Sequence, residues 1–174
     1  MDESYAFRGE NFSVKITTRN IRSRLQQFEV VERPKIVMAL PMALDGKALF
    51  FVRQQRVAVN QITIELPAGR VDEEENSEHA IRRELLEEIG FSSTVVEYVG
   101  NISTAPHFCD EKIQLFIAKG SIVKEPKPTS KESNLDVIRV ECSTLLSKMK
   151  AGFLTDAKSL AALSLAMANN YFDM

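Results

Sequence analysis

The segment that decides the fold is Gly69-Arg-Val-Asp-Glu-Glu-Glu-Asn-Ser-Glu-His-Ala-Ile-Arg-Arg-Glu-Leu-Leu-Glu-Glu-Ile-Gly-Phe91, which holds eight of the chain's 24 acidic residues. It predicts a helix over residues 77–89, because Ser77 can serve as the N-cap and Gly90 suits the left-handed position after the last turn. Positions i, i+3 and i+4 of a helix share one face. Three glutamates have this spacing: Glu84, Glu87 and Glu88.

These carboxylates need a compensating charge. An apolar stripe beside them, formed by Ile81, Leu85 and Ile89, would place them at the edge of the core. Like charges four residues apart destabilise a helix by roughly 0.2–0.5 kcal/mol per pair, and acidic groups near its C-terminus oppose its dipole by about 0.3–1 kcal/mol each. A solvated acidic face could explain the cluster, but it would not explain Gly69 or the spacing of the other residues in this segment. A hard divalent cation, Mg²⁺ or Mn²⁺, explains it directly, because oxygen ligands on adjacent turns converge on such an ion.

The same segment resembles the Nudix box at all of its fixed positions: Gly69, Glu75, Arg83, Glu84, Leu85, Glu87, Glu88, Gly90 and Phe91. The resemblance implies an α/β fold, an α/β/α sandwich with a mixed β-sheet. It also implies that Glu84, Glu87 and Glu88 are catalytic and, with the carbonyl of Ala68, bind divalent ions. Glu75 and Arg83 would orient these ligands by hydrogen bonds. Metal ions bound to a diphosphate would polarise it and make an attacking water more nucleophilic.

Features outside the box resemble the ADP-ribose pyrophosphatase subgroup. Glu65 opens the sequence Glu-Leu-Pro-Ala-Gly that leads into the box, and Pro106 lies sixteen residues after Gly90. The resemblance implies that Glu65, Pro106 and the strand-end arginines Arg53 and Arg56 bind substrate, and guanidinium groups suit a diphosphate. Each has a plainer explanation, since the proline can end a strand and the arginines can be solvated edge charges.

The catalytic base is left open by the sequence. Glu111 follows Pro106 as an acidic residue does in the subgroup, which makes it a catalytic candidate, although it could be a surface residue beside Lys112. Glu132 and Asp136 lie in a later polar stretch where relatives carry a base, but the match is poor. His107 stands where the subgroup has glycine, so it could touch substrate or be an ordinary loop histidine.

The chain divides near Pro34 into an N-terminal β region, 1–34, and a Nudix hydrolase domain, 35–174. The first region resembles the element through which the subgroup forms homodimers. In the second, Asp45-Gly46 predicts a turn and Pro67-Ala68-Gly69 a loop. The predicted strands are 12–16, 27–31, 36–40, 48–52, 62–66, 94–99, 113–118 and 137–140, and further helices are predicted at 143–150 and 156–169.

Composition excludes several classes of partner. A net charge of -2 and the absence of a basic stripe argue against nucleic acid, and the longest apolar stretch, 36–44, is too short to span a membrane. Two cysteines without paired spacing and an acidic N-terminus without an apolar stretch favour a cytoplasmic protein.

The leading hypothesis is therefore Mg²⁺-dependent hydrolysis of ADP-ribose to AMP and ribose 5-phosphate. The alternative is a nucleoside-diphosphate-sugar or dinucleotide pyrophosphatase with the same chemistry. A ligand sensor without turnover is the alternative of another class, and it would tolerate loss of the carboxylates that this chain retains.

Overall fold

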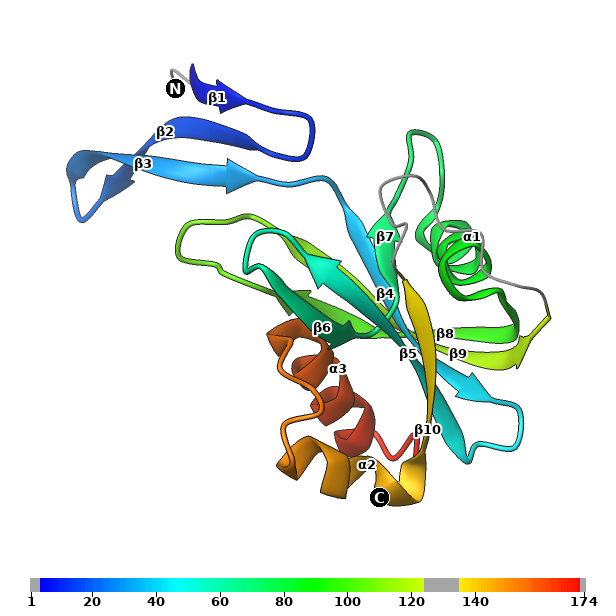
Figure 1. Cartoon of the computed structure of the whole chain (residues 1–174). Coiled ribbons are helices and arrows are strands. Elements are labelled where there is room, and N and C mark those ends of the chain that lie inside the picture. The colour runs from blue at the N-terminus through cyan, green and yellow to red at the C-terminus, as the bar shows by residue number, and fades with distance from the viewer. Residues whose placement is uncertain (1–3, 124–134, 173–174) are drawn as a thin grey trace.

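The structure is a computed structural model that describes residues 4–123 and 135–172 (Figure 1). These residues form ten strands and three helices. The strands are β1 (Ser4–Arg8), β2 (Ser13–Ile21), β3 (Arg24–Glu32), β4 (Ile36–Ala43), β5 (Ala48–Arg56), β6 (Gln61–Glu65), β7 (Ala68–Arg70), β8 (Phe91–Ser103), β9 (Lys112–Ile122) and β10 (Asp136–Glu141). The helices are α1 (Ser77–Ile89), α2 (Cys142–Lys150) and α3 (Ala157–Ala168).

The main sheet is mixed, as predicted. Its strands run in the order β10-β5-β4-β9-β8, with β6 paired to β5 and β7 paired to β4. The β4–β9 pair is parallel and the other described pairs are antiparallel. The short strand β7 leads the chain from this sheet towards α1.

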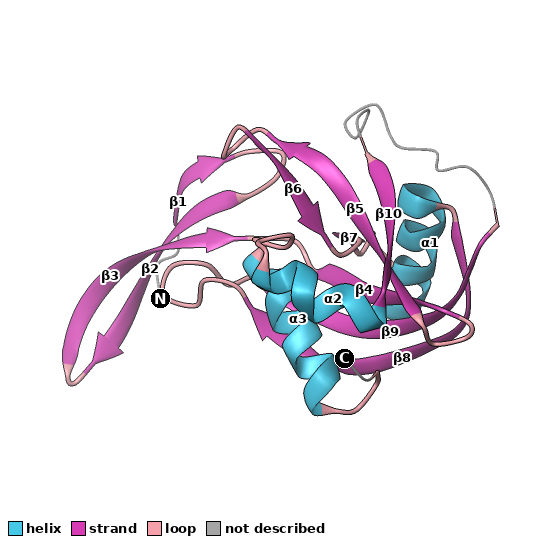
Figure 2. Ribbon diagram, turned by 60° about the horizontal axis from the view of Figure 1, so that its bottom comes forward, coloured by secondary structure: helices cyan, strands magenta, loops and turns pink. Residues whose placement is uncertain are grey.

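Helices cover both faces of this sheet, which gives the three layers of an α/β/α sandwich (Figures 1 and 2). Strand β4 shows how the sequence divides its side chains, because successive strand residues point to opposite faces. Val37 and Ala39 pack with Ile81 and Leu85 of α1. Residues of β4 on the other face, Met38 among them, share a core with residues of α2 and α3. Burial on both faces explains why this strand is apolar without alternation.

The N-terminal strands form a separate antiparallel sheet, β1-β2-β3, which projects from the body of the molecule (Figure 2). It joins the body at Val31, whose N–H donates to the carbonyl of Phe108 at 2.7 Å and whose carbonyl accepts from Asp110 N at 3.1 Å. Many of its apolar side chains are exposed, including Leu25 at 76%.

Most predicted elements are confirmed with longer bounds, and two local predictions are wrong. The N-cap of α1 is Asn76, not Ser77: the Asn76 side chain accepts from His79 N at 2.8 Å. Residues 68–70 form a strand instead of continuing the predicted loop, because β4 offers them a hydrogen-bonding edge. Among the described residues, no helix is both long and apolar enough to cross a membrane.

Candidate active site

Gly69 and Glu84 are in close contact where β7 packs against α1. A Cβ atom at position 69 would lie 1.9 Å from Cδ and 2.1 Å from Oε1 of Glu84. A side chain there would have to displace the carboxylate, so the space that Glu84 occupies explains why glycine stands at this position. The strand and the helix thus bring the backbone next to Ala68 into the immediate neighbourhood of a carboxylate.

The three glutamates of α1 differ in their exposure to solvent. Glu88 is buried, with 4% of its surface exposed, whereas the side chains of Glu84 and Glu87 are 13% and 47% exposed. Glu88 Oε2 is buried and accepts no hydrogen bond from the described residues, although Glu88 has other interactions. The carboxylates therefore lie at the edge of buried surface, where the apolar stripe of the helix was expected to place them.

Arg83 links these carboxylates to the preceding loop. Its Nη1 donates to Glu84 Oε1 at 2.9 Å and to Glu87 Oε2 at 3.3 Å. Its Nε and Nη2 donate to the two oxygens of Glu75 at 3.1 and 2.9 Å, and Nη2 also reaches the carbonyl of Arg70 at 2.9 Å. The hydrogen bond to Glu75 is the main cause of a raised Arg83 pKa and of a lowered Glu75 pKa.

The donor chemistry fits a divalent cation. No three acidic, histidine or cysteine side chains in the described part of the chain are gathered closely enough to hold a metal ion. In this arrangement the guanidinium of Arg83 pairs with both Glu84 and Glu87. Carboxylate oxygens are the ligands that Mg²⁺ and Mn²⁺ prefer, and the close approach of Gly69 leaves room for the Glu84 carboxylate.

A second charged cluster lies around Glu65, at the end of β6. Arg56 donates to both oxygens of this carboxylate at 2.7 Å, and Lys158 of α3 bonds to the same group. Burial opposes ionisation of Glu65, but hydrogen bonds and charge from Arg56 and Lys158 outweigh it and lower the pKa of Glu65 to about 2. The pKa of Arg56 is raised, chiefly by its hydrogen bond to Glu65 and also by the charge of Glu88.

Arg53 does not join this cluster. Residues three apart on a strand project from opposite faces, and Arg53 donates instead to Asp136 Oδ2 through Nε and Nη2 at 3.0 and 2.6 Å. Both side chains of this pair are at least half exposed. One candidate base, Asp136, is therefore engaged by one candidate substrate arginine. The other late candidate, Glu132, lies outside the described residues.

Glu111 is held from two sides in the loop that follows β8. Arg33 Nε donates to its Oε1 at 3.1 Å and Thr104 Oγ1 to its Oε2 at 2.9 Å. Its side chain is 14% exposed. Pro106 lies in the exposed turn of the same loop, and the ring of His107 contacts that of Phe108 at 4.6 Å between centroids.

Comparison with models of known protein families matches the NUDIX domain to residues 32–162 of this chain. The chain belongs to the Nudix family. The matched range includes α1 and every predicted ligand of a metal ion.

Two curated relatives of this Nudix protein are hydrolases of nucleoside diphosphate compounds by name. The ADP-ribose pyrophosphatase of Bacillus subtilis (strain 168) is 28% identical over 136 residues, which cover 78% of this chain and 73% of that protein. The GDP-mannose pyrophosphatase of Cronobacter sakazakii (strain ATCC BAA-894) is 28% identical over 171 residues and covers 94% of this chain and 88% of that protein.

A solved structure, described as an ADP compounds hydrolase, matches with a TM-score of 0.83 at 20% identity and covers 98% of this chain and 92% of that one. This likeness confirms the fold. The family match and the relatives make the chain an enzyme, a hydrolase that acts on diphosphate bonds.

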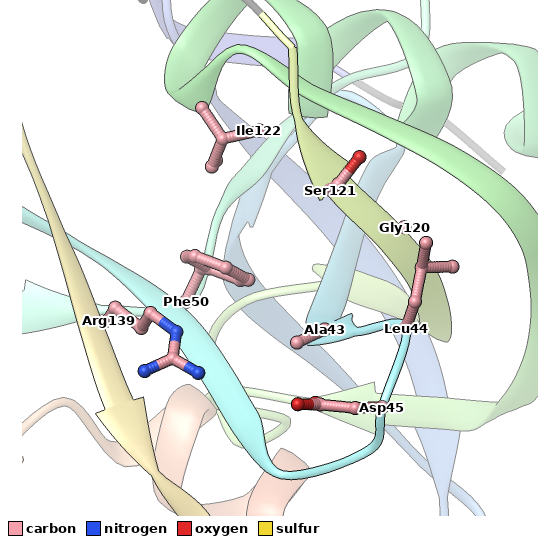
Figure 3. Close-up of a pocket in the computed structure, with 8 residues that line it drawn as sticks. All are labelled: Ala43, Leu44, Asp45, Phe50, Gly120, Ser121, Ile122 and Arg139. Atoms are coloured by element: carbon pink, nitrogen blue, oxygen red, sulfur yellow. The ribbon is translucent and has the colours of Figure 1, made fainter.

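A hollow of about 440 Å³ has no residue of the Nudix box in its lining (Figure 3). It lies beside the turn between β4 and β5 and is lined by Ala43, Leu44, Asp45, Phe50, Gly120, Ser121, Ile122 and Arg139. The predicted site residues are not among them, and most of its lining is apolar. Arg139 pairs with Glu141 on its own strand. This hollow therefore supports no assignment to the diphosphate site.

Three residues that contact the predicted site were missed at the sequence level: Lys158, Arg33 and Asn11. Lys158 follows Asp156 in a sequence that predicts only the start of a helix. Arg33 and Asn11 precede the family match or lie at its first residues, where no local pattern connects them with the Nudix box. Their roles arise from contacts between distant parts of the chain, with sequence separations of 59 to 93 residues.

Proposed function

We propose that this Nudix hydrolase cleaves the diphosphate bond of ADP-ribose and releases AMP and ribose 5-phosphate. The observations that carry the proposal are the partly exposed guanidinium of Arg56 and the buried carboxylate of Glu88 on α1. The first is suited to a phosphate, and the second is suited to a metal ion. One diphosphate would contact the arginine at one end and a bound ion at the other.

We further propose Mg²⁺, with Mn²⁺ as a substitute, held by the carbonyl of Ala68 and the carboxylates of Glu84, Glu87 and Glu88. The bound ion would supply charge stabilisation and a more acidic water. Arg83 pairs with Glu84 and Glu87 through Nη1, while Nε and Nη2 contact Glu75. Arg83 can therefore release the two ligands and keep its attachment to the loop.

Glu111 is our candidate for positioning the attacking water. Arg33 and Thr104 hold its carboxylate in one orientation, which would fix the position of a water that hydrogen-bonds to it. Asp136 is less suited, because its side chain is 60% exposed and that of Glu111 is 14% exposed.

The protein is further proposed to be a cytoplasmic homodimer. The exposed apolar side chains of the N-terminal sheet and its first turn support a dimer, because a group of exposed apolar side chains marks a surface that associates with another protein. They are Tyr5, Phe7, Phe12, Ile21, Leu25 and Phe28. Both cysteines are free thiols, in keeping with a reducing compartment.

A substrate panel tests the proposed function. ADP-ribose, GDP-mannose and a dinucleotide are incubated with Mg²⁺, with Mn²⁺ and with excess chelator, and the products are separated by chromatography. We expect AMP and ribose 5-phosphate from ADP-ribose with either ion and no products with chelator. A higher kcat/KM for GDP-mannose would favour the nucleoside-diphosphate-sugar alternative, which the relative from Cronobacter sakazakii supports by its name. Binding without turnover would favour the sensor.

A further inference from the structure

Lys158 occupies a position in α3 that local energetics disfavour. It lies in the first turn, after the N-cap Asp156, whose side chain accepts from Ser159 N at 3.0 Å. A cation near a helix N-terminus opposes the helix dipole by about 0.3–1 kcal/mol. Its side chain is also largely covered, with 21% exposed. The placement of this lysine therefore requires partners, and it has two, Glu65 and Asp156.

Glu65 lies between two cations. Only 3% of its side chain is exposed. Arg56 approaches with Nε and Nη2, each at 2.7 Å from one carboxylate oxygen, and Lys158 contacts Oε2. Lys158 also pairs with Asp156, so Arg56, Glu65, Lys158 and Asp156 together carry no net charge. Without the lysine, the other three groups would carry a net negative charge, which would oppose the binding of an anionic diphosphate.

Arg56 can contact a ligand because its side chain is only partly covered. Its side chain is 45% exposed, and the hydrogen bonds to Glu65 use the Nε edge of the guanidinium. The remaining N–H groups are directed away from that edge, since the guanidinium is planar and its donors form a fixed fork. Asp156 offsets the positive charge of Lys158. The N-terminus of α3, which Asp156 caps, in turn stabilises the negative charge of Asp156.

The start of α3 also holds the chain that leads into the Nudix box. Leu66 N donates to Ser159 Oγ at 2.8 Å, and Ser159 Oγ donates to Asp156. Ser159 is fully buried. The residues before Ala68 are thus attached to the same helical turn that carries Lys158.

We propose that Lys158 is a positioning residue for the substrate diphosphate, which acts through Glu65 to present Arg56 in a fixed orientation and balances the negative charge around it. The proposal rests on the proposed function only in taking a nucleoside diphosphate as the ligand class. It implies that loss of Lys158 weakens substrate binding and leaves bond cleavage in the bound complex largely intact.

The test compares Lys158→Met and Lys158→Arg with a control, Lys150→Met, which removes the same charge from an exposed position at the end of α2. For each protein, kcat and KM are measured with the substrate that the panel identifies, and ADP binding is measured by calorimetry without metal. We expect Lys158→Met to raise KM and the Kd for ADP about tenfold with kcat changed less than about threefold. Lys158→Arg should restore both to within about threefold of the wild type, because it restores the cation. Lys150→Met should change neither.

Several results would overturn the proposal. They are an unchanged KM and Kd in Lys158→Met, a fall in kcat at constant KM, failure of the arginine to rescue, or an equal effect in the control. Melting temperatures are measured for all variants, and Lys158→Gln replaces the methionine variant if that one does not fold. If the wild type prefers GDP-mannose to ADP-ribose, the proposed substrate is wrong, while the Lys158 comparison proceeds with GDP-mannose. If the wild type cleaves no diphosphate, ADP binding decides, and absence of ADP binding refutes the role of Lys158.

Discussion

The carboxylate of Glu84 fills the space in which a side chain on Gly69 would begin, with 1.9 Å between the Cβ position and Glu84 Cδ. This contact connects a backbone requirement in β7 with the chemistry of α1. A glycine that looks like a turn residue in the sequence is thus a steric condition for the placement of Glu84, which we propose as a metal ligand.

Gly69→Ala should therefore impair activity by displacing Glu84. We expect kcat/KM to fall at least about 100-fold with little change in the free energy of unfolding, because the displaced atoms are the far end of the flexible Glu84 side chain. The control is Gly100→Ala, whose Cβ would meet only the flexible end of Leu165 at 3.3 Å. Steady-state kinetics and urea unfolding measure both effects, and equal behaviour of the two variants would contradict the steric argument.

Glu88→Gln tests the assigned metal ligand. The substitution preserves shape at a buried position, so we expect the fold to survive while kcat falls at least about 100-fold with saturating Mg²⁺. Glu78→Gln changes the same residue type on the same helix, at a side chain that is 55% exposed, and should leave kcat within about threefold. Near-normal turnover in Glu88→Gln would remove that residue from the ligand set.

The lowered pKa of Glu65 predicts a specific acid sensitivity. Because its pKa is about 2 in the folded protein and 4.5 ordinarily, the ionised group stabilises the fold above pH 4.5 and loses this contribution as the pH falls towards 2. The full shift corresponds to roughly 3 kcal/mol. Glu65→Gln should thus lower the free energy of unfolding at pH 7 and flatten its decline between pH 4.5 and 2. Urea titrations across this range measure both, and parallel curves for variant and wild type would refute the assignment.

The exposed apolar side chains of the N-terminal sheet predict a dimer. Sedimentation at increasing concentration should show association, and Leu25→Lys should reverse it, since the leucine is 76% exposed and a charge there would oppose burial. Val57→Lys is the matched control, at an 89% exposed position outside this sheet. A wild-type protein that stays monomeric at all concentrations would rule out the dimer.

The sequence predicted the central elements well where the pattern was local. The bounds of α1 followed from the spacing of its charged and apolar residues and from Gly90, which adopts the predicted left-handed conformation. The cap itself was wrong by one residue, because Ser77 and Asn76 are both capable acceptors and only the geometry selects one. β7 was missed because three residues carry no periodicity and acquire strand structure from β4.

The candidate site was less predictable than the fold. Arg53 and Arg56 look equivalent in the sequence, yet their partners are Asp136 and Glu65. The strand alternation that separates them was present in the sequence, but the identity of each partner depends on pairing with β10 and β6. The contact of Lys158 with Glu65 could not have been assigned from the sequence, since the two residues are 93 positions apart.

The boundary near residue 34 divides the sequence into two regions, but residues of the first region contact the candidate site in the second. Asn11, in the turn between β1 and β2, accepts a hydrogen bond from Arg70 of β7 through its side chain and from Arg33 through its carbonyl. Arg33 in turn holds Glu111. Trimming the protein to a minimal catalytic unit would therefore strip supports from both the Nudix box and the loop that carries Glu111, so the smallest fragment that folds need not be the smallest fragment that works.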